Sequence, residues 1–282
     1  MLDAFTAAGF DFIDTADVYS RFIPGNQGGE SEVILGKWMK ARGNRDRVIL
    51  ATKAGMDMGE GREGLSKAYL FKAVEDSLRR LQTDYIDLYQ AHVDDPKTPL
   101  EETLGAFAEL IRQGKVRVIG ASNYSAERLD AALAVSDRLG LPAYQSLQPL
   151  YNLIDRTAYE AELQPLCKAK GLGVIPYFSL ASGFLTGKYR SEADFANSSR
   201  GGFVKHHLND RGLRILDALD QVAEGFNATP GMVALAWLMA QPTVTAPIAS
   251  ATSLAQLQEL VRATELKLDR QAMEQLDRAS AA

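Results

Sequence analysis

Short apolar runs rich in β-branched and aromatic residues alternate with longer segments of helical period along the whole chain. Several of these runs are almost continuously apolar, as parallel strands covered on both faces are. The segments between them carry apolar stripes at helical spacing, such as Phe71, Val74, Leu78 and Leu81. This alternation predicts an α/β protein with a parallel sheet. Seven runs are strand candidates: residues 10–14, 47–53, 84–92, 116–123, 144–148, 172–177 and 243–248.

Two architectures are built from repeated strand–helix–strand units, the doubly wound sheet and the (β/α)8 barrel. A doubly wound sheet that binds a dinucleotide usually has the motif G-x-G-x-x-G after its first strand, and this chain lacks the motif there. Polar residues instead follow several different strand candidates, and a barrel brings all its strand ends to one mouth. We therefore predict a (β/α)8 TIM barrel that forms one domain over residues 1–282, with these polar residues at its mouth: Asp14, Lys53, His92, Ser122, Asn123, Gln148 and Tyr177.

The seven strand candidates are one short of the eight that a closed barrel needs. The chain also opens with MLDAFTAAGF, which reads as the end of a helix. We therefore predict that the barrel is incomplete at its N-terminus. A gap is expected between the strand that ends at Asp14 and the segment that ends at Ile248, unless another chain or a rearranged segment fills it.

The composition limits the partners of the chain. Its 282 residues carry a net charge of −5 with acidic and basic residues interleaved, so it offers no basic stripe and we expect no nucleic acid partner. The single cysteine, Cys167, can form no intrachain disulfide, which suits a reducing compartment. No apolar run approaches the roughly 20 residues that span a bilayer. We expect a cytoplasmic protein that does not enter membranes, and a homo-oligomer stays open.

Four residues at or just beyond strand ends, Asp14, Tyr19, Lys53 and His92, form a candidate proton-donating set. A tyrosine with its usual pKa of about 10 donates a proton near neutral pH only if a neighbour stabilises its phenolate. Lys53 can lower the pKa of Tyr19 by charge attraction, and Asp14 can hold the ammonium group. His92 can hydrogen-bond a carbonyl oxygen and orient a substrate.

Each of these four residues alone also has a structural explanation, as a helix cap, a rim residue, a surface charge or a core histidine. Their joint placement favours proton donation to a C=O group while another species attacks its carbon. The sequence has no spacing typical of a metal site, so no metal is expected.

Six segments in order make the chain similar to the aldo-keto reductase family: FIDTADVYS, ILATKAG, LYQAH, IGASNYS, LQPLYNLIDR and YFSLASGFLTGKY. The last segment resembles the branch that includes bacterial general reductases and the potassium-channel β-subunits. The resemblance implies a barrel that binds a nicotinamide cofactor, in which Tyr19 is the general acid, Lys53 and Asp14 tune it and His92 orients the carbonyl. It also implies a cofactor-binding set: Ser122, Asn123 and Gln148 at the carboxamide, Tyr177 on the nicotinamide ring, Leu180, Ser182, Lys188 and Arg200 at the pyrophosphate, and Thr252, Gln256 and Glu259 at the adenosine.

The chain departs from the family pattern at three places. Phe178 and Ser179 stand at a cofactor-binding position where a small residue and a proline are usual, so backbone contacts to the pyrophosphate are expected to differ. The adenosine end lacks the lysine or arginine that often grips the 2′-phosphate and has polar residues there, namely Ser250, Ser253 and Gln256. NADP(H) stays the expected cofactor, with NAD(H) as the alternative and Arg262 as a compensating charge. The family's N-terminal hairpin and first barrel strand are also expected to be missing.

The leading function predicted is NAD(P)H-dependent reduction of aldehyde or ketone carbonyls in small molecules, with the proton from Tyr19. Two alternatives stay open, a cofactor-binding regulatory or interaction subunit and a truncated inactive homologue. His92 favours the enzyme, because it supplies the substrate-orienting position expected of a working reductase. Loops at the barrel mouth are expected to select the substrate, here residues 20–30, 56–66 and 190–210.

Overall fold

The computed structural model describes residues 1–195 and 201–281 of the chain. Contacts divide the chain into two compact units, and each is described here by itself. The sheet unit comprises residues 10–148, and the helical unit comprises residues 1–9 together with 149–282. That the whole chain forms one domain stays a prediction.

The sheet unit contains five parallel strands that pair in the order of the sequence. Its register places Ile13 opposite Leu50, Ala51 opposite Leu88, and Ala121 opposite Leu147. All carboxyl ends of these strands therefore lie at one edge, where the predicted site residues follow. The strands are β1 (Phe12–Asp14), β2 (Ile49–Ala54), β3 (Ile86–Ala91), β4 (Val116–Ser122) and β5 (Ser146–Gln148).

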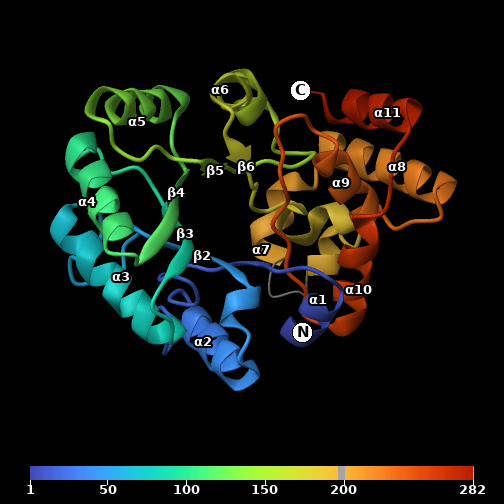
Figure 1. Ribbon diagram of the computed structural model, residues 1–282. Coiled ribbons are helices and arrows are strands. Elements are labelled where there is room, and N and C mark those ends of the chain that lie inside the picture. The colour runs from blue at the N-terminus through green and yellow to red at the C-terminus, as the bar shows by residue number, and fades with distance from the viewer. Residues whose placement is uncertain (196–200, 282) are drawn as a thin grey trace. The chain divides into compact units, whose positions relative to one another are not determined.

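A helix follows each of the first four strands and packs along the sheet (Figure 1). Val74, Leu78 and Leu81 of the predicted apolar stripe are buried. Ser125 accepts a hydrogen bond from the backbone N–H of Arg128 and so caps the helix that follows β4. The helices are α2 (Glu30–Arg42), α3 (Lys67–Leu81), α4 (Leu100–Arg112) and α5 (Ala126–Leu139), and a 3-10 helix, η1 (Arg45–Arg47), precedes β2.

The helical unit is built around α9 (Pro230–Met239), which is buried along almost its whole length, with Trp237 fully enclosed. Thr229 caps this helix and Pro230 occupies its first turn. Within the described ranges, no helix combines the length and the apolarity needed to cross a membrane. The other helices are α1 (Leu2–Ala7), η2 (Tyr159–Leu163), α6 (Gln164–Lys170), η3 (Ala181–Thr186), η4 (Glu192–Phe195), α7 (Gly201–Val204), η5 (Lys205–His207), α8 (Asp210–Gly225), α10 (Leu254–Ala263) and α11 (Arg270–Ser280).

Two further strand candidates lie in the helical unit. The first contains the short strand β6 (Gly173–Val174). The second, residues 243–248, is not a regular strand, but Val244 forms a parallel bridge with Val174 and the N–H of Thr245 donates to the carbonyl of Val174 at 2.8 Å. Six of the seven predicted strands are therefore confirmed, in the strand–helix order of a (β/α)8 barrel. The gap expected beside Asp14 stays a prediction.

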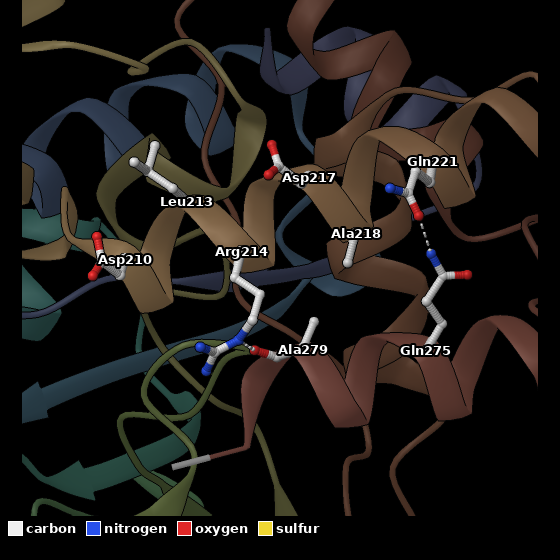
Figure 2. A pocket seen from close by; sticks show the side chains of 8 residues that line it. All are labelled: Asp210, Leu213, Arg214, Asp217, Ala218, Gln221, Gln275 and Ala279. Atoms are coloured by element: carbon white, nitrogen blue, oxygen red, sulfur yellow. Dashed lines mark hydrogen bonds between the residues drawn. The ribbon is translucent and has the colours of Figure 1, made fainter.

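Helices α8 and α11 of the helical unit enclose a shallow surface hollow (Figure 2). Arg214 on α8 donates from Nε to the carbonyl of Ala279 at 3.0 Å, and Gln275 on α11 donates to Gln221 at 2.7 Å. Arg211 adds a bond from Nη2 to the carbonyl of Ser280 at 2.6 Å. Positive side chains thus satisfy the free carbonyls at the end of α11. None of the predicted site residues lines this hollow.

Candidate active site

The four residues of the candidate proton-donating set all lie in the sheet unit and come together at its carboxyl edge. Asp14 ends β1, Lys53 lies near the end of β2, and His92 follows β3 directly. Strand pairing continues a little beyond the strands, because the N–H of Asp17 donates to the carbonyl of Lys53 at 3.2 Å. Tyr19 lies in the turns that follow, so its ring returns toward the end of β2.

Lys53 is the centre of this group. Its side chain is fully buried, and Nζ donates to Asp14 Oδ2 at 2.7 Å, to Tyr19 OH at 2.9 Å and to the carbonyl of Thr15 at 2.8 Å. An ammonium group has three N–H donors, so all three find acceptors here. The Tyr19 hydroxyl also lies 3.4 Å from Asp14 Oδ2.

Two amide side chains hold Asp14 from the other side. Gln148, at the end of β5, donates from Nε2 to Asp14 Oδ1 at 2.9 Å. Gln90 on β3 lies at 3.4 Å from the same oxygen. Both amides are buried. The carboxylate is therefore fixed by three strands, and Gln148 contacts the candidate proton-donating set as well as being a residue predicted at the cofactor.

Burial and the ion pair act in opposite directions on Lys53. Burial alone lowers the pKa of an amine, but the charges of Asp14 and Tyr19 and their hydrogen bonds outweigh it, so the pKa of Lys53 lies above its usual value. Lys53 is therefore positively charged at neutral pH.

Two effects act in opposite directions on the pKa of Tyr19. Burial raises the pKa of Tyr19 above 10.0, and the charge of Lys53 lowers it by a smaller amount, in the direction expected from the sequence. The net rise was not anticipated, because the argument from the sequence included the ammonium charge but not the loss of water around the phenol.

His92 lies beside Tyr19 with the two rings edge to face and their centroids 5.9 Å apart. Burial, aided by the charge of Lys53, lowers the pKa of His92 to about 3. Its Nδ1 is buried and has no hydrogen-bond partner among the residues that the structure describes. The ring is therefore neutral at physiological pH.

Ser122 and Asn123 lie next to the proton-donating group. Ser122 donates from Oγ to the carbonyl of Gln148 at 2.8 Å, and Asn123 donates from Nδ2 to the carbonyl of His92 at 2.9 Å. Asn123 has a left-handed backbone with φ of 56°. The three residues predicted at the carboxamide are thus brought together at one edge of the sheet unit.

The residues predicted at the ring and the pyrophosphate follow β6 in the helical unit. Tyr177 and Phe178 meet edge to face at 5.2 Å, and Phe178 is 58% exposed. Phe178 and Ser182 have left-handed backbones, with φ of 52° and 55°. The Lys188 ammonium lies against Gly183, where an added Cβ would be 3.0 Å from Nζ. Leu180 belongs to the same loop, and Arg200 lies outside the described residues.

The residues predicted at the adenosine lie on and near α10. Gln256 accepts from the N–H of Thr252 at 2.8 Å and from its hydroxyl at 2.9 Å. Glu259 accepts a hydrogen bond from Thr229, the cap of α9. Gln256 and Glu259 thus organise the start of α10 and of α9.

A second buried polar group in the sheet unit was missed in the sequence. It consists of Asp17, Glu32 and Arg80, and we call it the acid cluster. A signal was present: Glu32 lies at helical spacing from Leu35 and Met39, so it shares their buried face of α2. A charged residue in an apolar stripe is expected to have a buried partner.

Comparison with known proteins agrees with this architecture. The strand–helix order is that of a (β/α)8 protein, and the model of the aldo/keto reductase family matches residues 1–281. The chain belongs to the aldo/keto reductase family. It is 35% identical to the uncharacterized oxidoreductase YrpG of Bacillus subtilis, over 95% of this chain and 82% of that protein. It is 36% identical to the aldo-keto reductase YhdN of the same bacterium, over 91% of this chain and 75% of that protein.

A probable voltage-gated potassium channel subunit beta from Oryza sativa subsp. japonica is 33% identical, over 94% of this chain and 81% of that protein. The resemblance stated from six sequence segments is therefore confirmed, including both kinds of relative. Membership places the chain among oxidoreductases that act on small carbonyl compounds.

Proposed function

We propose that this protein reduces aldehyde or ketone carbonyls with a nicotinamide cofactor and that Tyr19 donates the proton. The observation that carries the proposal is the fully buried Lys53, whose ammonium contacts both the Tyr19 hydroxyl and the Asp14 carboxylate. A buried cation on a phenol oxygen stabilises the phenolate that remains after proton transfer.

The raised pKa of Tyr19 agrees with a donor that stays protonated until the reaction needs it. When negative charge develops on the substrate oxygen, the proton moves from the Tyr19 hydroxyl to that oxygen. Lys53 then holds the phenolate, and Asp14 keeps the ammonium in place. Proton donation of this kind contributes about 10²–10⁴-fold to a rate.

His92 is proposed to orient the carbonyl oxygen toward Tyr19. A neutral imidazole donates one hydrogen bond without drawing off the proton, and the lowered pKa of His92 keeps it neutral. Its buried and unpartnered Nδ1, the one such ring nitrogen reported among the described residues, supports a role toward a bound molecule.

A reduced nicotinamide cofactor supplies the hydride when bound. We propose that Ser122, Asn123 and Gln148 hold its carboxamide in the sheet unit. In the helical unit, Lys188 lies against Gly183 in a loop with left-handed backbone, and its cation would pair with a pyrophosphate. NADP(H) is the expected form. NAD(H) is the alternative, because the N-cap of α10 is Ser253 and its first turn carries Gln256 in place of a cation that would bind a 2′-phosphate.

A second candidate function is a cofactor-binding regulatory subunit. It is favoured by the similarity to a protein named as a potassium channel β-subunit. The two candidates differ in turnover, because a regulatory subunit needs cofactor binding alone.

The test is a fluorescence titration with NADPH and NADH, followed by turnover with a panel of aldehydes. Replacing Tyr19 by Phe should abolish turnover and leave cofactor binding unchanged, because only the proton is removed. Tyr85→Phe is the matched control, since that ring lies before β3 at the opposite edge of the sheet and keeps its contact with Arg45. Unchanged turnover in Tyr19→Phe would refute the donor, and cofactor binding without turnover of any aldehyde would favour the regulatory subunit.

A further inference from the structure

Asp17 joins the acid cluster to the proposed proton donor. It lies two residues before Tyr19, and its N–H bonds to the carbonyl of Lys53. Its side chain is 2% exposed. The segment that carries Tyr19 is thus anchored to the strand that carries Lys53 through a residue whose own carboxyl group is buried.

The other two members of the acid cluster pair with each other. Glu32 on α2 is fully buried, accepts from Thr52 Oγ1 at 2.6 Å and accepts from Arg80 Nε at 2.6 Å. Arg80 on α3 also donates to Ser77 Oγ at 3.2 Å. Asp17 gains no such bond at Oδ1, which is buried and without a hydrogen-bond partner in the described part of the chain.

Five titratable groups from four elements act on Asp17 or share its surroundings: Glu32 on α2, Arg80 and Tyr69 on α3, Lys53 on β2 and Tyr89 on β3. Burial raises the pKa of both tyrosines, so they are neutral at physiological pH. The charges of Lys53 and Arg80 are balanced by those of Asp14 and Glu32. If Asp17 is ionised, its negative charge is therefore the one among these groups that no positive charge balances.

Burial, with the charge of Glu32 acting in the same direction, raises the pKa of Asp17 to about 7, against the attraction of Arg80 and Lys53. The carboxyl group therefore changes its charge within the physiological pH range. Backbone pairing places Asp17 next to Lys53, because the Asp17 N–H donates to the Lys53 carbonyl at 3.2 Å, and the Lys53 ammonium contacts the Tyr19 oxygen at 2.9 Å. A charge on the buried Asp17 carboxyl group therefore acts on the cation that contacts Tyr19.

We propose that Asp17 is a positioning residue whose ionisation weakens Tyr19 as a proton donor by offsetting the positive charge of Lys53. The inference rests on the proposed function, in which Lys53 stabilises the Tyr19 phenolate. When Asp17 is neutral, the ammonium acts on the phenol undiminished, so Tyr19 gives up its proton more readily. When Asp17 is ionised, part of that attraction is cancelled. Carbonyl reduction should then slow as the pH rises through neutrality.

The test measures the ionisation of Tyr19 directly and needs no turnover. Ultraviolet absorption of tyrosinate is followed during an alkaline titration, and the signal of Tyr19 is the difference between each protein and its Tyr19→Phe version. In Asp17→Asn, which keeps the shape but has no charge, Tyr19 should ionise at a pH lower by at least about half a unit. Asp11→Asn is the control, because that exposed carboxylate lies in the same segment.

Identical Tyr19 titrations in wild type and Asp17→Asn would overturn the inference. If Asp17→Asn fails to fold, Glu32→Gln replaces it. Removing the charge of Glu32 makes Asp17 ionise at lower pH, and the pH at which the steady-state rate declines should move down with it. An unmoved rate profile in a folded Glu32→Gln protein would equally contradict the role of Asp17. Failure of the proposed function is seen separately, as absence of aldehyde turnover by the wild type.

Discussion

The sheet unit contains two ion pairs of nearly equal length, each with a fully buried member, and the groups around them are in different states. Lys53 and Asp14 meet at 2.7 Å, and Arg80 and Glu32 meet at 2.6 Å. Around Lys53 every donor is used, and its third partner is a phenol. In the acid cluster a second acid, Asp17, has a buried oxygen, Oδ1, with no hydrogen-bond partner among the described residues. The Lys53–Asp14 pair thus binds the hydroxyl group of Tyr19. The Arg80–Glu32 pair leaves the carboxyl group of Asp17 without a bond at Oδ1.

This difference shows that the charge balance around a buried ion pair decides what the pair can do. A buried pair gives little net stability, because desolvation offsets the attraction, but removing one partner is strongly unfavourable. Removing one partner should be unfavourable for both pairs. Only the pair of Lys53 and Asp14 contacts a hydroxyl group, that of Tyr19, which we propose as the proton donor. Three variants test how far the two pairs differ, from the largest expected effect to the smallest.

Lys53→Met should break the first pair and have the largest effect. The rate of carbonyl reduction should fall by about 10²–10⁴-fold, because the Tyr19 phenolate loses its cation. Lys40→Met, on the exposed face of α2, is the control and should keep the wild-type rate. Steady-state kinetics with one aldehyde decide the matter, and a Lys53→Met rate within a few fold of wild type would remove Lys53 from the mechanism.

Arg80→Met should break the second pair and act on stability. Glu32 and Asp17 would then share a buried site with no adjacent cation, which costs about 3–5 kcal/mol in the free energy of unfolding. The loss should be greater at pH 8 than at pH 6, since Asp17 is ionised only at the higher pH. The neighbouring Arg79 is 73% exposed, so Arg79→Met should change stability by about 0.5 kcal/mol or less. Urea unfolding measures the free energy of unfolding of both variants. Equal losses of stability in Arg80→Met and Arg79→Met would mean that Arg80 does not stabilise the buried acids of the acid cluster.

Asp17→Asn should change how stability depends on pH. The unfolded carboxyl releases its proton near its usual pKa, but the folded one holds it to about 7, so the wild type loses stability as pH rises between these values. This contribution is about 3 kcal/mol between pH 5 and pH 8. The variant should lack it. His92 acts with the opposite sign, because its lowered pKa removes stability as pH falls below the unfolded value. The contribution of His92 cancels when the free energies of unfolding of variant and wild type are compared at each pH. A difference between them that does not change with pH would disprove the raised pKa of Asp17.

The sequence predicted the strand order and the chemistry-bearing strand ends well, because hydrophobic runs and the residues that follow them are local signals. Asp14, Tyr19, Lys53 and His92 were expected together and lie together. The segment at residues 243–248 was expected as a strand and forms only a bridge, since pairing depends on a neighbour that no local pattern specifies.

What the sequence did not predict depends on burial. The direction of the pKa of Tyr19 follows from the water it loses, and that loss is visible only in three dimensions. Arg79 and Arg80 are adjacent in the sequence, and Arg79 is exposed. The packing of α2 against α3 makes Arg80 the partner of Glu32, and no local pattern shows this. The roles of the residues named for the cofactor stay predictions.

The glycines that end the loop before α2 set a limit for anyone who wishes to redesign this protein. Gly28 and Gly29 have φ near +90°, and a Cβ on Gly29 would lie 2.6 Å from Arg80 Nε. Any side chain at that position would push the guanidinium away from Glu32. Phe22 and Ile23 in the same loop are 80% and 49% exposed. A mutant library aimed at new substrates can therefore vary the exposed Phe22 and Ile23, while Gly28 and Gly29 should be left as glycine.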